Sequence, residues 1–241
     1  MVELKARADA GDALAASRLF RDVKTCFRVW NTNQKAIDSM LADMESGKVQ
    51  GSERALNDVR ERVELVQTSA SLCAGLDIEQ ISELVPATLR AAQLGDTEAT
   101  DCYVAIGVFG MEAMPGLIDH PEWISDYKRS VLPIAEAAIS KENWNVVTML
   151  HGAYGREQRN NLLLSQVTGT DSVQAYRYLR LMDLAVPGGN PHWKPSLEEL
   201  ENEIGPSKRS EADAWAQKTY QDYFASSPLD QMKGPMACRI Y

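Results

Sequence analysis

Apolar side chains recur at alternating intervals of three and four residues in two long segments of the chain. The first segment covers residues 12–30, and the second covers residues 52–73. This spacing places the apolar side chains on one face of an α-helix and the charged side chains on the other faces. The pattern therefore predicts two amphipathic helices. Their apolar positions are Ala16, Leu19, Val23, Cys26 and Trp30 in the first, and Leu56, Val59, Val63, Val66, Ala70 and Cys73 in the second.

Alternation at every second residue, which is typical of strands, does not continue over any long stretch of the sequence. Residues 103–109, YVAIGVF, are the one segment that resembles a strand, and the helical pattern around them favours a helix. The sequence therefore predicts an all-α fold in a single domain, 1–241. Within it, the proline- and glycine-rich stretch 186–196 predicts an exposed loop before the C-terminal helices, and residues 226–241 form a C-terminal tail.

A helix is expected to begin at the end of that loop. Ser196 is followed three positions later by Glu199. This spacing is typical of a capping box, in which each of the two side chains accepts a hydrogen bond from the other residue's backbone amide. We therefore expect Ser196 to be the N-cap of the helix.

Two stretches of the sequence are nearly copies of each other. Residues 4–19 read LKARADAGDALAASRL, and residues 89–104 read LRAAQLGDTEATDCYV. Glycine tolerates the left-handed backbone that ends a helix, and aspartate is a favoured N-cap for the next one. Gly11–Asp12 and Gly95–Asp96 therefore predict tight turns between antiparallel helices. A weaker copy covers residues 132–150, with Asn143 in the capping position.

The pattern A-x-x-G-D-x-x-A in both copies resembles the SEL-one-like helical repeat, a relative of the tetratricopeptide repeat. The spacing of ~34 to 40 residues that is usual between such units is not kept here. The resemblance implies an irregular, repeat-like α-α superhelix of antiparallel helical hairpins that binds proteins on a concave surface. An ordinary helical bundle is the alternative. The chain also resembles exported bacterial proteins of this repeat class, some of which neutralise the toxins of rival cells.

The charge of the chain limits the partners that we expect. Lys and Arg total 25 against 34 Asp and Glu, which gives a formal net charge of −9. Such a surface repels nucleic acid and attracts a basic protein. The sequence has no apolar run long enough to span a membrane. We therefore expect a protein partner, for example a basic toxin or effector, with no nucleic acid and no membrane span.

Four cysteines indicate the compartment. They form no CxxC pair and have no metal-like spacing to histidine, so no metal site is predicted. Cys26 and Cys73 lie on the apolar faces of the two amphipathic helices, which predicts a disulfide between them and leaves Cys102 to pair with Cys238. These bonds would place the protein in the periplasm, with Met1 standing where an export signal was removed. Four reduced cysteines in the cytoplasm are the alternative.

Candidate catalytic residues are few. The sequence contains three histidines, His120, His151 and His192, and none of the common nucleophile, phosphate-binding or metalloprotease motifs. His151 near Tyr154 is the most enzyme-like combination, and a structural role at a helix end is the simpler interpretation of it. We therefore expect a protein that is not an enzyme and uses no cofactor. An envelope hydrolase with a His or carboxylate site is the alternative.

Partner binding is the function that these features favour. Aromatic and arginine side chains dominate protein interfaces, and the loop 186–196 carries His192 and Trp193. Tyr154 and Arg156 lie near a predicted helix end. These four residues are the predicted contacts. The most specific form of this hypothesis is an immunity protein that occludes a secreted antibacterial toxin; a helical-repeat scaffold of the cytoplasm is a further alternative.

Overall fold

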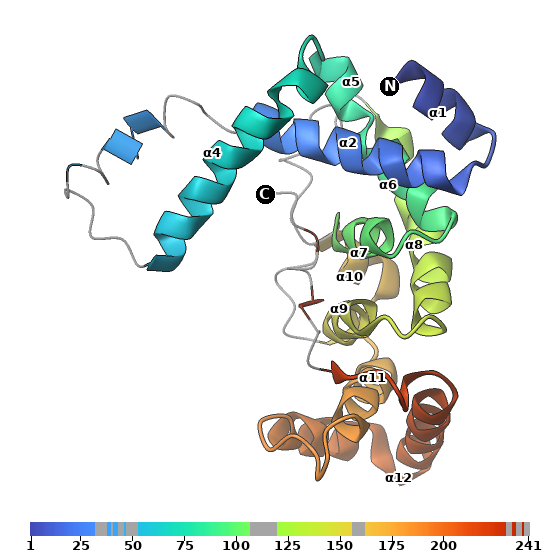
Figure 1. The fold of residues 1–241 in the computed structure, drawn as a ribbon. Coiled ribbons are helices and arrows are strands. Elements are labelled where there is room, and N and C mark those ends of the chain that lie inside the picture. Colours follow the sequence, from blue (N-terminus) through green and yellow to red (C-terminus); the bar gives the residue numbers. More distant parts are fainter. Residues whose placement is uncertain are drawn as a thin grey trace. The chain divides into compact units, whose positions relative to one another are not determined.

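The computed structural model describes residues 1–31, 38–39, 41–42, 46, 53–106, 120–155, 162–229, 233–234 and 238. Every regular element in these residues is helical, and they contain no strand (Figure 1). The predicted all-α fold is therefore confirmed. Residues 103–106, the described part of the segment that resembled a strand, lie in a helix. Within the described chain, no helix combines the length and the apolar character that crossing a membrane requires.

The chain divides into two compact units, with the boundary between Ala87 and Thr88. The sequence predicts one domain over 1–241, and it offers no linker at this boundary because a continuous helix, α6 (Leu84–Gln93), runs through it. The first unit contains several helices before α6, and the structure gives the bounds of those named next. They are α1 (Val2–Asp9), α2 (Ala13–Asn31), α4 (Glu53–Cys73) and α5 (Ile78–Ser82).

The first unit is built around α2. Figure 1 shows α1 lying along α2, and α4 and α5 also pack against α2. The predicted apolar face of α2 is buried at Leu19, Val23 and Cys26, whereas Trp30 is 51% exposed. Cys26 and Cys73 form a disulfide, with 5.3 Å between their Cα atoms. This covalent bond joins α2 to the C-terminal end of α4, and it is the pairing that the sequence predicts.

The second unit contains the remaining helices. They are α7 (Thr97–Ile106), α8 (Pro121–Ile139), α9 (Trp144–Tyr154), α10 (Leu162–Thr168), α11 (Ser172–Leu184) and α12 (Lys194–Thr219), which is followed by the π-helical turn η2 (Tyr220–Phe224). Helix α9 packs against α7, α8, α10 and α11, and α11 packs against α12. The largest fully buried side chains of this unit belong to Tyr103, Tyr176, Phe224, Leu150, Leu164, Leu179 and Leu181.

The two glycine–aspartate pairs have the same backbone geometry. Gly11 and Gly95 have φ angles of 91° and 92°, in the left-handed region that favours glycine. The amides of Asp12 and Asp96 each donate to the carbonyl oxygen five residues earlier, at 3.0 Å. Their side chains each accept a hydrogen bond from the amide three residues later, at 3.0 and 2.8 Å. Each pair therefore ends one helix and caps the next.

The turn between α8 and α9 repeats this geometry without a glycine. The amide of Asn143 donates to the carbonyl oxygen five residues earlier, at 3.2 Å, and its side chain caps α9 by accepting from the amide of Val146. Glu142 holds the position of the glycine, with a φ of 62°. It is the one residue other than glycine with a positive φ in the described chain. The backbone of the turn is thus kept although the residue that favours it is missing.

Helix α12 begins earlier than the sequence predicts. Its first residue is Lys194, and Trp193 precedes it without a capping side chain. The prediction that Ser196 is the N-cap is therefore wrong, because Ser196 already lies in the first turn. Pro195 explains the early start, since proline has no amide to satisfy and its fixed φ suits a first helical turn. Gly205, with a φ of 75°, interrupts α12.

The C-terminal tail is held to α7 and α9 by several bonds. Cys238 forms a disulfide with Cys102, with 4.6 Å between their Cα atoms, which is the second predicted pairing. The side-chain oxygen of Asn145 accepts hydrogen bonds from the amides of Lys233 and Gly234, at 2.7 and 3.0 Å. These bonds attach the described residues of the tail to α7 and α9.

Candidate functional site

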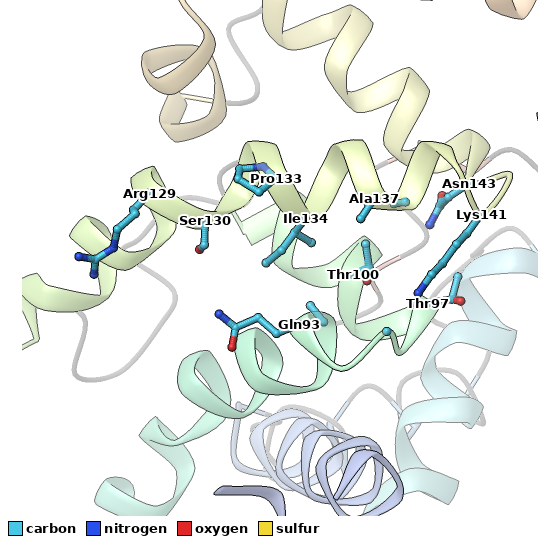
Figure 2. Close-up of a pocket in the computed structure, with 13 residues that line it drawn as sticks. Gln93, Thr97, Thr100, Arg129, Ser130, Pro133, Ile134, Ala137, Lys141 and Asn143 are labelled. Carbon is cyan, nitrogen blue, oxygen red and sulfur yellow. The ribbon is translucent and has the colours of Figure 1, made fainter. Parts of the chain in front are cut away.

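The second unit has a groove along α8, which we call the α8 groove. Its volume is about 410 Å³. One wall is a face of α8 and the turn that follows it, from Arg129 to Asn143. The other wall is the end of α6, the Gly95 turn and the first turn of α7 (Figure 2). Two of the three capped turns described above, those at Gly95 and at Asn143, therefore contribute directly to this groove.

The spacing of residues on α8 creates its wall of the groove. Arg129, Pro133 and Ala137 follow one another at intervals of four, so they form a row along one side of α8. Lys141 continues this interval in the turn after Ile139, the last residue of the helix. Buried residues on the other side of α8, including Val131 and Ala135, anchor the helix in the core. The row therefore faces away from the core, with a cation at each end and small apolar side chains between them.

The groove is lined by positive charges, whereas the net charge of the whole chain is negative. Its lining side chains include Arg129 and Lys141 and no Asp or Glu, whereas the formal net charge of the chain is −9. Figure 2 shows Arg129 and Lys141 at opposite ends of the row. Arg129 forms an ion pair with Asp126, one turn earlier on α8, and its side chain remains 75% exposed. Such an exposed pair contributes little and exchanges readily for another partner.

Lys141 extends across the end of the groove toward the Gly95 turn. A Cβ atom at Gly95 would lie 2.8 Å from the Nζ atom of Lys141, so glycine there permits both the positive φ and this close approach. Within the described residues, the Lys141 side chain has no hydrogen bond and no ion pair. Its ammonium group is thus positioned at the end of the groove, and no carboxylate of the described chain is paired with it.

A second hollow, which we call the α9 pocket, lies between α9, α11 and α12 and has a volume of about 200 Å³. His151 and Tyr154 from α9 line it, together with Glu199 and Glu203 from α12. The hydroxyl of Ser172 donates to the carboxylate of Glu203 at 2.6 Å. This pocket therefore brings an imidazole, a phenol and two carboxylates into one lining.

The hydrogen bond and the burial of His151 determine the tautomer and the charge of its ring. Its Nδ1 atom lies 3.0 Å from the carbonyl oxygen of Ala175. A carbonyl oxygen only accepts, so Nδ1 carries the hydrogen and Nε2 is the acceptor of the neutral ring. Burial lowers the pKa of His151, although the bond to Ala175 opposes this shift. The ring is thus uncharged at neutral pH, with one nitrogen lone pair not used by the backbone.

The three predicted contact residues that the structure describes, Tyr154, His192 and Trp193, do not line one pocket together. Tyr154 lines the α9 pocket, and its ring stacks on that of Tyr178 with 5.9 Å between the centroids. His192 and Trp193 lie in the turn before α12, and they line neither the α8 groove nor the α9 pocket. Arg156 lies outside the described residues. Burial raises the pKa of Tyr154, so its hydroxyl stays protonated at physiological pH.

Sequence reasoning did not identify the α8 groove. The available signal was the four-residue interval from Arg129 to Ala137, which a helix turns into a row. The wall that faces this row comes from α6, α7 and the turn between them, and their packing is not written in the interval. No group of three or more His, Cys, Asp or Glu side chains suited to a metal ion occurs among the residues that the structure describes.

Comparison of the chain with protein-family models, with curated proteins and with solved structures gives no match. The function is therefore inferred from the chemistry of this chain alone. Three features carry that inference: the α8 groove, the α9 pocket and the two disulfides.

Proposed function

We propose that this protein is a non-catalytic protein-binding module of the bacterial envelope. The α8 groove carries the proposal. It is about 410 Å³ in volume and runs along α8 from Arg129 to the turn after the helix, with apolar side chains between two cationic ends. A hollow of this form suits a chain segment of another protein, for which helix grooves are common recognition sites.

The disulfides support a location in the envelope. All four cysteines of the chain are paired, Cys26 with Cys73 and Cys102 with Cys238. Structural disulfides persist in oxidising compartments such as the periplasm and are rare in the reducing cytoplasm. The periplasm is therefore the compartment that we propose, in preference to a cytoplasmic scaffold.

The most specific form of the proposal is an immunity protein that occludes a secreted antibacterial toxin. The resemblance of the glycine–aspartate repeats to those of exported bacterial proteins supports it. The net charge of −9 also supports a basic partner, because it accelerates the encounter with one at long range. Occlusion requires tight binding and no chemistry on the partner.

A growth assay combined with calorimetry tests this proposal. The chain, exported to the periplasm, would be produced together with each protein that is encoded beside it in its genome. We expect one of these proteins to stop growth when produced alone and to be harmless in the presence of the chain. The purified pair would then bind in calorimetry. If none of the proteins encoded beside the chain is toxic and none binds it, the immunity function is rejected. The more general proposal of protein binding is then retained.

The α9 pocket favours one second candidate, an envelope hydrolase. His151 offers an uncharged acceptor nitrogen in the same pocket as Glu199 and Glu203, and these are groups that general acid–base catalysis uses. Wild type and His151→Gln would be compared on peptidoglycan and on chromogenic ester and glycoside substrates. The binding proposal expects no turnover by either protein. Turnover that disappears in His151→Gln would replace it with the hydrolase.

A further inference from the structure

We infer that the α8 groove binds an extended acidic segment of the protein partner, with a carboxylate near each end and apolar side chains between. This inference rests on the proposed binding function and identifies the chemistry of the partner. The juxtaposition that carries it is a row of Arg129, Pro133 and Ala137 on α8, continued by Lys141 in the turn after the helix, opposite the Gly95 turn (Figure 2).

The charge of the occupant follows from the charges of the groove. Arg129 and Lys141 are its charged lining residues, and no carboxylate lines it. A basic segment would place like charges together there, whereas a carboxylate would form a charge-assisted hydrogen bond with either cation. Lys141 has no partner to exchange within the described residues, so its pairing with an incoming carboxylate breaks no existing bond.

The length of the occupant follows from the helix. Arg129 and Lys141 are twelve positions apart, and α8 ends at Ile139, two positions before Lys141. The helical rise of ~1.5 Å per residue gives about 15 Å from Arg129 to the helix end, and the turn extends this to roughly 18 Å at Lys141. An extended chain advances about 3.3 Å per residue, so five or six residues span this distance. The two acidic residues of the segment are therefore expected about five to seven positions apart, the larger number allowing for the outward reach of the two cationic side chains.

The middle of the groove determines what lies between the two carboxylates. Pro133 and Ala137 on the row, with Ile134 beside them, present apolar surface that is at least partly exposed. Apolar side chains of the segment would bury this surface. Gln93 on the opposite wall is exposed, and its side-chain amide has no hydrogen bond within the described residues. This amide is available to the backbone of an extended segment, which has both donors and acceptors to satisfy.

A local cationic groove is compatible with a basic partner. The net charge of −9 acts on a whole protein at long range. The groove acts on one segment in contact, where the nearest charges dominate because salt screens the distant ones. The partner would thus be basic overall and carry one acidic segment that enters the groove.

A peptide selection tests the inference. The full-length protein, with its disulfides intact, would be immobilised and offered a phage library of random dodecamers. We expect enrichment of sequences with two Asp or Glu residues about five to seven positions apart and apolar residues between them. The most enriched sequence, synthesised and measured by calorimetry, would bind more weakly as salt increases. Enrichment of basic sequences, or of no common pattern, would overturn the inference.

Matched variants connect the selected peptide to the groove. In R129E/K141E we expect the affinity of the synthetic peptide to fall at least about tenfold. K128E/K208E changes the charge by the same amount at exposed positions that do not line the groove, and it should bind as wild type does. Ala137→Trp fills the groove without a charge change and should also weaken binding. Equal affinity in all variants would place the peptide elsewhere and overturn the inference.

The acidic-segment site and the proposed function can be disproved separately. Suppose that a natural partner binds wild type and R129E/K141E equally well, while circular dichroism shows both to be folded. The binding function then stands and the acidic-segment site is wrong. If no natural partner is found but the selected acidic peptide binds in the groove, the site stands and the immunity function is wrong.

Discussion

Glu142 holds, in the turn between α8 and α9, the backbone position that Gly95 holds in the turn between α6 and α7. The φ angles are 62° and 92°, and both turns continue into a capping side chain, Asn143 in one and Asp96 in the other. A side chain in this left-handed region costs of order 1 kcal/mol relative to glycine. The turn at Glu142 therefore tolerates a strain that the turns at Gly11 and Gly95 avoid.

Glu142→Gly is expected to stabilise the protein by about 1 kcal/mol, because it removes this strain from an exposed residue. Chemical denaturation followed by circular dichroism measures the change in the free energy of unfolding. The control is Gly11→Ala, at a position with a φ of 91° and no atom within 4 Å of the added Cβ. It should destabilise by a similar amount. A destabilised Glu142→Gly would show that the side chain makes a contact that outweighs the strain.

Asp101 is expected to make folding more favourable as the pH falls. Its carboxylate is buried and accepts hydrogen bonds from the side-chain amides of Asn143 and Asn145, each at 2.8 Å. Burial raises the pKa of Asp101 despite these two bonds. With a folded pKa above the unfolded value, the folded state binds the proton more tightly, so the contribution of Asp101 to stability increases as pH falls through the folded pKa.

The measurement compares wild type with Asp101→Asn, which does not titrate. The difference in the free energy of unfolding, wild type minus variant, should rise between about pH 6 and pH 4, which is opposite to the behaviour of an ordinary ion-paired carboxylate. A difference that falls over this range would mean that the two amide hydrogen bonds outweigh burial.

His151 is expected to act in the opposite direction. Burial lowers its pKa in the folded state, so the unfolded state binds the proton more tightly. The stability contributed by the neutral ring is then present above the unfolded pKa of about 6.5 and is lost as pH falls below it. Wild type should lose stability relative to His151→Gln between about pH 7 and pH 5. If NMR measured a pKa of the His151 imidazole at or above the usual value of about 6.5, this expectation would be contradicted.

The disulfides are expected to contribute strongly to stability. They close segments with sequence separations of 47 residues for Cys26–Cys73 and 136 for Cys102–Cys238. Replacing either pair by serine should cost roughly 3–5 kcal/mol by the loop-entropy model. For C102S/C238S we also expect faster proteolysis of the tail, whose other anchors among the described residues include the hydrogen bonds of Ser227 and Asn145. Denaturant unfolding and limited proteolysis measure the two effects.

Thiol titration of the denatured, unreduced protein tests the envelope location. Protein purified from the native host should show no free thiol, because all four cysteines are paired. Protein denatured after reduction is the control and should show four. Four free thiols in unreduced native material would favour the cytoplasmic scaffold.

The sequence identified the features that depend on nearby residues. A glycine that ends a helix and an aspartate that caps the next one act within about five positions of each other, so Gly95–Asp96 was recognisable from the letters alone. The Cys26–Cys73 bond was also predictable, because both residues lie on strong apolar stripes and such faces pack together. Glu142 shows the limit of this reasoning, since its backbone is left-handed although its residue type gives no sign of it.

Tertiary structure alone decided which faces are covered and which surfaces face each other. Ala70 lies on the apolar stripe of α4, yet it is exposed, while Val59 on the same stripe is buried. Arg129 and Lys141 became the ends of a groove because α8 packs beside α7 and the turn before it. Periodicity fixes the direction of a side chain around its own helix axis, but the neighbour that it meets depends on how helices distant in sequence pack. Local chemistry therefore determined the helices and their ends, and packing between them determined the groove.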